Sequence, residues 1–397
     1  MMKKQSLLKL TLLLAASLTV MSGATIAPSL PAMNELFDQV PNAALLTKLV
    51  LTLPALFIAL AAPFVGVLIN RFGRLRLLYI SLAIYAIAGS TGLWMNDLYD
   101  ILIGRAFLGV AVGGIMTVSS TLVGDYFTGE ERNSFSGLQS LFMSAGGIVF
   151  VGLGGLLADM DWRFPFAIYL FSIVVMVLVA ISLVEPKDEF KNDNKAVGNN
   201  RNLPYQKIGA ILATLFIAMV VFYMTPVQIP FLLQERGAES ASLSGLAIAF
   251  STIGGAIGAG FYARLKRKLS FQKLFAITFV TLALGYAIVG FGTTYVLALT
   301  GLLISGFGVG LLMPNGTVWL LEITPLPQRG TIMGLFTSAL FIGQFASPIL
   351  AQPLATKMGL GYTFVAMAMI SGVIGIFYLV TKNNGKVEAK TSLIDNQ

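Results

Sequence analysis

The chain contains no cysteine and no histidine among its 397 residues. Without cysteine it can form neither a disulfide nor a thiolate metal site, and without histidine it lacks the commonest metal ligand and proton shuttle of proteins. We therefore expect no metal ion and no cofactor. Charged residues make up only 11% of the chain, whereas hydrophobic residues make up 56%. A soluble domain carries about 25% charged residues, so the composition predicts a surface solvated by lipid.

Long apolar blocks separated by short polar gaps run along the whole sequence. Each block has about the 20 residues that a membrane-spanning helix needs. The blocks are continuously apolar rather than alternating, which favours helices over the strands of a membrane barrel. The predicted fold is an all-α integral membrane protein with twelve transmembrane helices. The expected spans are residues 7–30, 46–69, 77–95, 98–123, 134–158, 164–184, 207–231, 241–263, 274–293, 295–321, 332–354 and 359–381.

Lysine and arginine fall almost entirely in every second gap between these blocks. The exceptions among the 26 basic residues are Lys48, Arg105, Arg163, Arg236 and Lys357. Gaps rich in basic residues face the cytoplasm under the positive-inside rule. We therefore expect a multi-pass protein of the cytoplasmic membrane with both termini cytoplasmic. The same bias accounts for the net charge of +8 without a nucleic-acid partner.

The beginning of the chain allows a second interpretation. Lys3 and Lys4 precede an apolar stretch, and small residues follow at Ser22, Gly23 and Ala24. This pattern is also typical of a cleaved signal peptide. Cleavage would leave eleven spans. Because eleven is an odd number, the two termini could then no longer both lie in the cytoplasm.

The longest polar segment, residues 185–206, divides the chain into two sets of six spans. We interpret it as a cytoplasmic linker between an amino-terminal six-helix bundle, residues 1–184, and a carboxy-terminal bundle, residues 207–381. Residues 382–397 would then form a cytoplasmic tail.

Two features recur at corresponding places in the halves. The turn that runs from Gly66 to Arg74 after the second span is loosely similar in sequence to the turn after the eighth span. Prolines are expected to bend or end the first and seventh spans near their outer ends, and these are Pro28, Pro31, Pro226 and Pro230. Such duplication predicts two pseudo-symmetric bundles that alternate access around a site at the midplane.

Two short motifs are similar to signatures of the major facilitator superfamily, most closely its twelve-helix drug:proton antiporter-like branch. The signature between helices 2 and 3, Gly-x-x-x-Asp-Arg-x-Gly-Arg-Arg/Lys, is matched at Gly66, Arg71, Gly73 and Arg74. The signature in helix 4, an arginine followed four residues later by glycine, is matched at Arg105 and Gly109. The resemblance covers nearly the whole chain.

The resemblance implies a gate that closes the cytoplasmic side. Arg71 and Arg74 can pair with a carboxylate at the cytoplasmic end of helix 4, and the glycines permit close helix approach and a tight turn. Asn70 replaces the family's aspartate, so the gate should be weaker. Alternatively, the arginines only set the topology. The expected gate residues are Gly66, Asn70, Arg71, Gly73, Arg74, Asp125 and Arg132.

Arg105 is the one charged side chain expected well inside a span. A guanidinium in hydrocarbon costs several kcal/mol, so it should face the bundle interior or a watery cavity and touch carbonyls or a polar partner. We interpret it as a residue for proton movement or for holding an anionic substrate group. The alternative is that it reaches the outer interface and pairs with Asp97 or Asp100.

Acidic residues are absent from the expected helix midpoints. Proton-coupled relatives commonly use embedded carboxylates, so the resemblance implies proton coupling without indicating a clear local site. The candidates for coupling are Arg105, Asp125, Glu322 and Glu35.

A cavity with Arg105 and no buried carboxylate has nothing to neutralise a cation, which favours neutral, zwitterionic or anionic amphiphiles. We expect its lining to come from helices 1, 4, 7 and 10 and their partners. Each polar side chain there could equally be a hydrogen bond between helices. The expected pathway residues are Ser22, Thr25, Arg105, Gln139, Met143, Tyr223, Gln228, Asn315 and Gln344.

The predicted function is secondary active transport of a small amphiphilic organic molecule by alternating access, with proton-coupled efflux as the first hypothesis. Helix 5 carries Phe150-Val151 where the antiporter signature has Gly-Pro, which leaves a proton symporter or a passive facilitator for uptake open. A non-transporting receptor is a weaker alternative. An enzyme is excluded because the bundle offers no nucleophile with a base, no carboxylate pair and no metal ligands. We expect a monomer whose partners are the substrate, protons and lipid.

Overall fold

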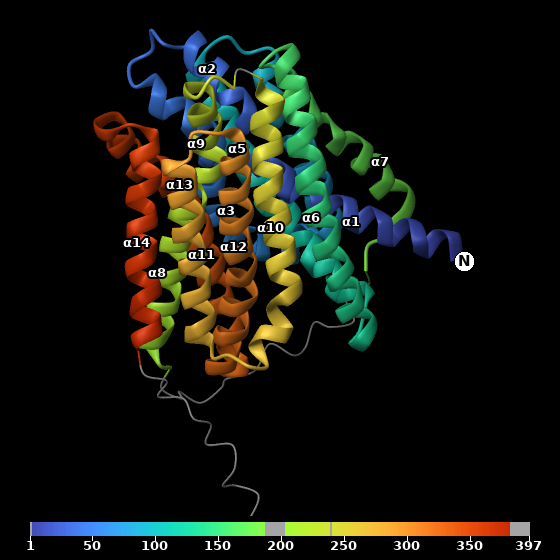
Figure 1. Ribbon diagram of the computed structural model, residues 1–397. Coiled ribbons are helices and arrows are strands. Elements are labelled where there is room, and N and C mark those ends of the chain that lie inside the picture. The colour runs from blue at the N-terminus through green and yellow to red at the C-terminus, as the bar shows by residue number, and fades with distance from the viewer. Residues whose placement is uncertain (1, 187–202, 239, 382–397) are drawn as a thin grey trace, which may run out of the picture.

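The computed structural model describes residues 2–186, 203–238 and 240–381, except for the side chains at 2–4, 63, 67, 70 and 133 (Figure 1). The regular structure of these residues is entirely helical. Twelve segments are long and apolar enough to cross a membrane, and each predicted span overlaps one of them. The predicted fold class is therefore confirmed.

The amino-terminal half contributes the first six segments. In chain order they are α1 (Met2–Ala24) with η1 (Ala27–Ser29) and α2 (Leu30–Leu36), α3 (Ala43–Phe72), α4 (Arg74–Gly89) with η2 (Ser90–Leu93), α5 (Leu98–Tyr126), α6 (Gly129–Met160), and η3 (Phe164–Leu170) with α7 (Phe171–Ser182).

The carboxy-terminal half contributes the other six. They are α8 (Tyr205–Phe222) with α9 (Met224–Glu235), α10 (Ala241–Lys266), α11 (Phe271–Phe291), α12 (Tyr295–Ile323), η4 (Leu326–Gln328) with α13 (Arg329–Met358), and α14 (Leu360–Val380). Helix α8 begins two residues before the predicted bundle boundary at 207. Most of the predicted linker and the whole predicted tail, residues 187–202 and 382–397, lie outside the described residues.

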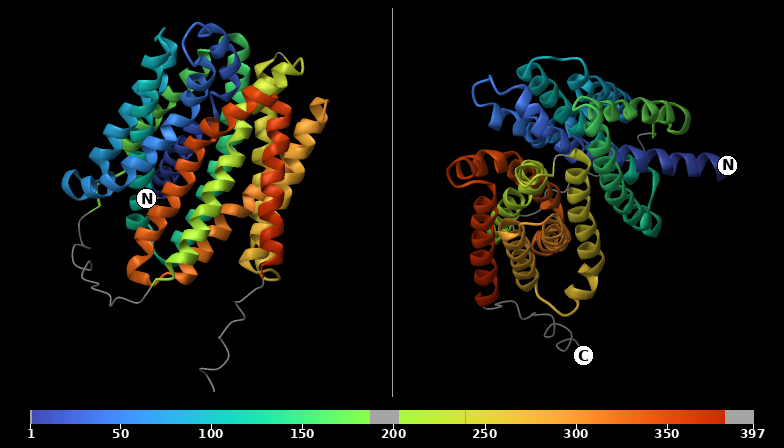
Figure 2. Two further views of the ribbon diagram at one scale, coloured as in Figure 1. Left: turned by 90° about the vertical axis from the view of Figure 1, so that its left-hand side faces the viewer. Right: turned by 45° about the horizontal axis from the view of Figure 1, so that its top comes forward.

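Each half has its own hydrophobic core. One core is built mainly from residues between Leu12 and Leu183, and the other from residues between Ile208 and Tyr378. Figure 2 shows the two groups of helices beside each other, blue to green in one half and yellow to red in the other. Many large apolar side chains remain exposed on the outer surface, among them Phe64, Phe107 and Phe291, as lipid contact requires.

The first and seventh spans are broken helices, as the prolines predict. Helix α1 ends at Ala24, and Pro28 and Pro31 begin the two short helices that follow it. Helix α8 ends at Phe222, and α9 continues with Pro230 inside it. Proline removes a backbone donor and clashes with the preceding turn, so each helix restarts in a new direction.

Tyrosine hydroxyls brace these two spans at corresponding places. Tyr85 on α4 donates to the carbonyl of Leu18 in α1 at 2.8 Å. Tyr286 on α11 lies 3.0 Å from the carbonyl oxygens of Val221 and Phe222, beside the break between α8 and α9. The third span thus donates a hydrogen bond to the first, and the ninth span donates one to the seventh. This correspondence is consistent with two related halves.

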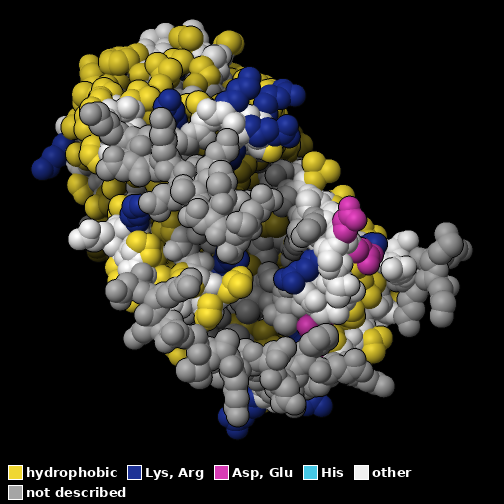
Figure 3. Space-filling model, turned by 90° about the horizontal axis from the view of Figure 1, so that it is seen from below, with side chains coloured by type: hydrophobic (Ala, Val, Ile, Leu, Met, Phe, Trp, Pro, Cys, Tyr) yellow, Lys and Arg dark blue, Asp and Glu magenta, His cyan; other side chains and the backbone are white. Residues whose placement is uncertain are grey.

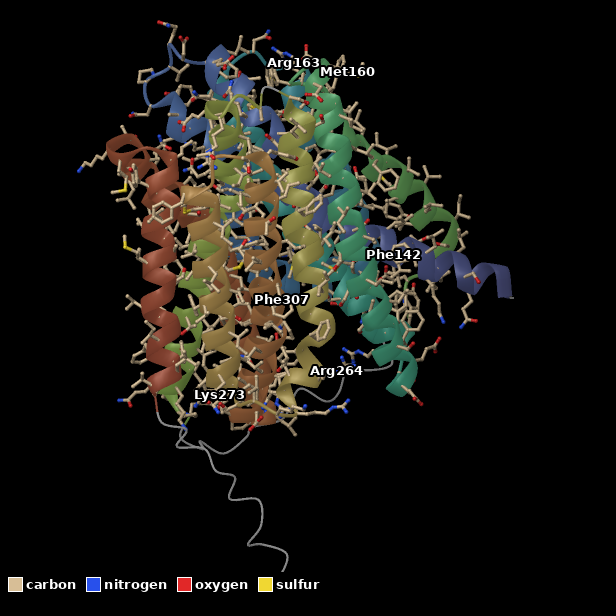
Figure 4. All side chains as sticks on the ribbon, viewed as in Figure 1. Phe142, Met160, Arg163, Arg264, Lys273 and Phe307 are labelled. Atoms are coloured by element: carbon tan, nitrogen blue, oxygen red, sulfur yellow. The ribbon has the colours of Figure 1, made fainter. Side chains whose placement is uncertain are left out.

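The most extensive packing between the halves is that of α3 with α13 and of α6 with α10, and α2 also contacts α9. Helices α6 and α10 lie side by side at the top of Figure 1 and diverge toward the bottom. We call the lower end, which carries the α3–α4 and α10–α11 turns, the linker end, and the upper end the opposite end. Arg264 and Lys273 lie at the linker end, and Arg163 lies at the opposite end (Figure 4). Seen from the linker end, the molecule is hollowed between the halves (Figure 3).

Candidate substrate cavity and gates

A cavity of about 400 Å³ lies between the two halves. Its walls come from α1, α3, α5 and α6 on one side, and from the α8–α9 segment, α10, α12 and α13 on the other. Among the described residues that line it, none is aspartate, glutamate, lysine or arginine. The polar lining consists of Thr19, Ser22, Tyr223, Thr225, Ser251, Thr252, Thr337 and Gln344.

The rest of the lining is apolar and rich in methionine. Unbranched thioether side chains adapt to irregular ligands and make favourable contacts with aromatic rings. The methionine and phenylalanine residues of the lining are Met116, Met143, Met219, Met313, Phe222, Phe336 and Phe341. Such walls suit an apolar or aromatic body with a few hydrogen-bonding groups.

Four of the nine predicted pathway residues line this cavity. They are Ser22, Met143, Tyr223 and Gln344. The two halves meet closely here, because a Cβ atom placed on Gly23 of α1 would lie 3.1 Å from the hydroxyl of Tyr223. The structure thus brings part of the predicted set together across the interface.

The other polar residues of that set lie elsewhere. The hydroxyl of Thr25 donates to the carbonyl of Met21 at 2.6 Å, and the amide of Asn315 donates to the carbonyl of Phe271 at 3.0 Å. Gln228 on α9 is fully buried, and neither of its amide atoms has a hydrogen-bond partner among the described residues. Gln139 lies on α6 and outside the described lining.

Arg105 lies behind the cavity wall rather than in it. Its side chain is fully buried, and Nη2 donates to the carbonyl of Gly89 at 2.8 Å. The guanidinium carbon lies 4.6 Å from the ring centroid of Phe166 and 4.7 Å from that of Tyr169. The hydroxyl of Tyr169 in turn donates to the carbonyl of Ser22, 3.4 Å away on the cavity-lining helix.

This geometry meets one expectation for Arg105 and corrects another. The guanidinium does contact a carbonyl inside the bundle, and among the described residues it forms no ion pair with Asp97 or Asp100. It is not part of the cavity lining, so it cannot directly hold an anionic group of a ligand there. Arg105 therefore gives no reason to prefer an anionic substrate.

At the linker end, three of the seven predicted gate residues, Gly73, Arg74 and Asp125, lie together. Arg74 Nε lies 2.8 Å from Asp125 Oδ2, an ion pair between α4 and α5. Glu185, just beyond α7, accepts hydrogen bonds from the backbone nitrogens of Arg74 at 2.7 Å and Leu75 at 2.8 Å. Gly73 has φ +84°, the left-handed region that favours glycine. These contacts all join helices of the amino-terminal half.

Other members of the predicted gate are less engaged. A Cβ atom on Gly66 would meet no atom within 4 Å, so the close helix approach expected there is not made in this structure. Arg71 and Arg132 are exposed, and the side chain of Asn70 lies outside the described residues. Sequence reasoning missed Glu185, because its capping role depends on where α7 ends relative to α4.

At the opposite end, three groups of hydrogen bonds connect the halves, and we call them the opposite-end gate. Lys48 Nζ donates to Gln352 Oε1 at 2.5 Å, and Gln234 Nε2 donates to Glu35 Oε1 at 2.6 Å. The carboxylate of Asp159 accepts from three groups at the start of α10, the Ser240 hydroxyl at 3.0 Å and the backbone nitrogens of Ala241 at 2.6 Å and Ser242 at 3.2 Å.

Asp159 caps a helix that belongs to the other half. Ser240 occupies the N-cap position of α10, but its own hydroxyl caps no backbone nitrogen of that helix. The free amides at a helix N-terminus favour a carboxylate, both as hydrogen-bond donors and through the helix dipole. The cap can therefore form only while α6 and α10 are together at this end.

Removing the charge of Asp159 should loosen this end. In Asp159→Asn the side-chain amide is a weaker acceptor, and we expect a loss of about 1 kcal/mol from the closed arrangement. Because the chain lacks cysteine, accessibility of a single introduced cysteine at the opposite end measures the shift. Asp161→Asn is the matched control, since Asp161 accepts from Arg163 within its own half. An equal shift in both variants would contradict the role of the cap.

The four predicted coupling residues do not come together. Asp125 pairs with Arg74 at the linker end, and Glu35 belongs to the opposite-end gate. Glu322 is exposed near the linker end of α12, and Arg105 is buried in the amino-terminal half. Of the four, only Glu35 lies at a contact between the two halves.

Known proteins are similar to this chain in sequence and in fold. A family model described as Major Facilitator Superfamily matches residues 12–309 and 211–395. The bacillibactin exporter of Bacillus subtilis (strain 168) is 23% identical over 364 residues, covering 87% of this chain and 90% of that protein. Multidrug resistance protein 2 of the same strain is 24% identical over 333 residues, covering 79% and 81%.

Solved structures agree with the family match. The crystal structure of a D-xylose-proton symporter superposes with a TM-score of 0.77 at 16% identity, covering 94% of this chain and 96% of that chain. That identity shows the fold alone. Together with the family match, it establishes a multi-pass membrane transporter rather than an enzyme. The chain therefore belongs to the major facilitator superfamily, as its motifs predicted.

Proposed function

We propose that this protein exports a small, uncharged amphiphilic organic molecule across the cell membrane in exchange for protons. The observation that carries the proposal is the cavity between the halves, whose described lining is apolar with hydroxyl and amide groups but no charge. A dehydrated cation or anion would find no counter-ion in such a site, and burying an unpaired charge is costly.

The two ends of the cavity support alternating access. The opposite-end gate is formed, while the linker end is hollowed between the halves (Figure 3). Reversing this arrangement would require the opposite-end contacts to break and the halves to meet at the linker end. The exposed gate residues of α3 would then come closer to the carboxy-terminal half.

Orientation in the membrane decides which direction counts as export. The basic residues gather in the gaps of the linker end, which by the positive-inside rule lies in the cytoplasm together with both termini. The cavity of this structure would then load from the cytoplasm. Export is supported by two relatives, one named an exporter of bacillibactin and one named a multidrug resistance protein.

A proton symporter is the second candidate, supported by the structural neighbour that is named a D-xylose-proton symporter. Proteoliposomes with an imposed pH gradient separate the two. For the antiporter, N-phenyl-1-naphthylamine should move against its gradient, opposite to the protons, and nigericin should abolish this movement. Movement with the protons would favour symport, and equilibration that ignores the gradient would favour a passive facilitator.

A charged derivative of the probe tests the preference of the transporter for an uncharged substrate. The 8-sulfonate derivative of the same probe, 1-anilinonaphthalene-8-sulfonate, shares the aromatic body and adds one negative charge. We expect it to be transported much more slowly, because the described lining offers no cation to it. Faster transport of the sulfonate than of the neutral probe would contradict an uncharged substrate.

A further inference from the structure

Lys48 is a buried basic group at the interface between the halves. It lies in the second span, and only 4% of its surface is exposed. Its Nζ donates to Gln352 Oε1 at 2.5 Å and lies 4.4 Å from the ring centroid of Phe231. Both partners belong to the carboxy-terminal half, so this surrounding exists only while the opposite-end gate is closed.

The closed gate gives Lys48 no counter-ion. Among the described residues, no carboxylate comes within ion-pair distance of Nζ. Glu235 on α9 is exposed and acts on Lys48 only through a longer electrostatic interaction, and Glu35 is held by Gln234. The charged side chains that neighbouring elements carry toward this end are Glu35, Asp38, Asp97, Asp100, Arg105, Glu235, Arg236 and Lys357.

Burying an ammonium group in this position is therefore costly, whereas burying the neutral amine is not. A buried charge without a partner costs several kcal/mol, and one amide oxygen and one ring face repay only part of this. Opening the gate removes Gln352 and Phe231 and exposes the amine to water. The open gate thus favours the protonated form, and the closed gate favours the neutral form.

Unpartnered polar groups lead from Lys48 toward the cavity. On α3, Thr52 lies one turn beyond Lys48. On α9, Gln228 lies one turn from Phe231 and one turn from Thr225, which lines the cavity. The hydroxyl of Thr52 and both amide atoms of Gln228 are buried without a partner among the described residues. Buried polar groups almost always find a partner, and a water file between the two helices would supply one.

We propose that Lys48 carries the proton that this transporter exchanges for its substrate. With the opposite-end gate open, Nζ takes a proton from water outside the membrane. Closing the gate makes the ammonium unfavourable, and the proton passes, through the water that Thr52 and Gln228 hydrogen-bond, to water in the cavity, which faces the linker end. Each cycle forms and breaks one N–H bond and moves one proton inward. The inward direction of proton movement rests on the proposed export function.

The gate response can be measured without any substrate. Gln39→Cys and Tyr362→Cys place two spin labels at exposed positions of the opposite end, one on each half, in a chain that has no other cysteine. In lipid nanodiscs, we expect the distance between the labels to lengthen as the pH falls from about 10 to about 6, a range in which carboxylates keep their charge. Lys48→Met should hold the short distance throughout, and Lys48→Arg the long one.

The control is Lys357→Met, which removes an exposed lysine of α13 at the same end and should keep the response. A pH response that persists in Lys48→Met, or that is absent from the parent protein, would overturn the proposal. In proteoliposomes, Lys48→Met should lose the accumulation of N-phenyl-1-naphthylamine that the pH gradient drives, whereas Lys357→Met should keep it. If the parent protein moves no probe while the distance response holds, the export function fails and the titration of Lys48 stands.

Discussion

Replacing Arg105 with alanine should abolish transport while the protein still inserts into the membrane. The variant loses the hydrogen bond to Gly89 and the stacking on Phe166 and Tyr169, a local loss of about 2–5 kcal/mol. Tyr169 would no longer be fixed where its hydroxyl supports Ser22 on the cavity wall. Insertion should persist, because α5 becomes more apolar with alanine in place of arginine.

Flux in proteoliposomes and thermal unfolding in detergent check this prediction together. Arg236→Ala is the matched control, because Arg236 also donates to a glycine carbonyl, that of Gly290 at 3.1 Å, but at the edge of the other half. Its flux should stay close to that of the parent protein. Unimpaired flux in Arg105→Ala would show that the buried guanidinium is dispensable.

Gly155→Leu should stop transport by holding the opposite end open. Helices α6 and α10 touch at this glycine, where a Cβ atom would lie 2.9 Å from the Cα of Ser242 and 3.1 Å from the carbonyl oxygen of Ala241. These are backbone atoms, which cannot rotate away as a side chain can. Overpacking of this kind costs about 1–3 kcal/mol, and here the whole cost falls on the closed state.

Gly152→Leu provides the control for the same helix. A Cβ atom there would meet nothing within 4 Å, so the added side chain should be tolerated and flux retained. Spin-label distances at the opposite end should lengthen in Gly155→Leu and remain unchanged in Gly152→Leu. Equal behaviour of the two variants would mean that the contact at Gly155 does not control closure.

The spans were predictable because span length and apolar composition follow directly from bilayer thickness. The direction in which each side chain points was not predictable from the sequence. Helix α5 is covered by protein except along a stripe that includes Ile103 and Phe107, so periodicity could exclude the lipid side but could not decide whether Arg105 pointed into the cavity or into its own bundle. The same ambiguity placed Gln228 in the pathway, although it is buried outside the described lining.

Contacts between the halves were the least predictable part of the site. Lys48 and Gln352 are 304 residues apart in sequence, and neither belongs to a local motif. In the sequence, Lys48 stands out only as one of the five basic residues outside the cytoplasmic gaps. The one local signal was Ser240 directly before α10, an N-cap residue type whose helix is capped instead by Asp159 of the other half.

The modest strength of the opposite-end gate sets the energy scale of the transport cycle. A hydrogen bond to a charged group contributes about 1.5–3 kcal/mol net, and inverting a two-state population from 1:99 to 99:1 takes about 5.5 kcal/mol. The free energy of the three groups of hydrogen bonds is therefore of the same order as the binding free energy of one ligand, or as the free energy of moving one charge. Stronger contacts would hold the transporter in one conformation. Contacts of this strength allow thermal motion to interconvert the two conformations.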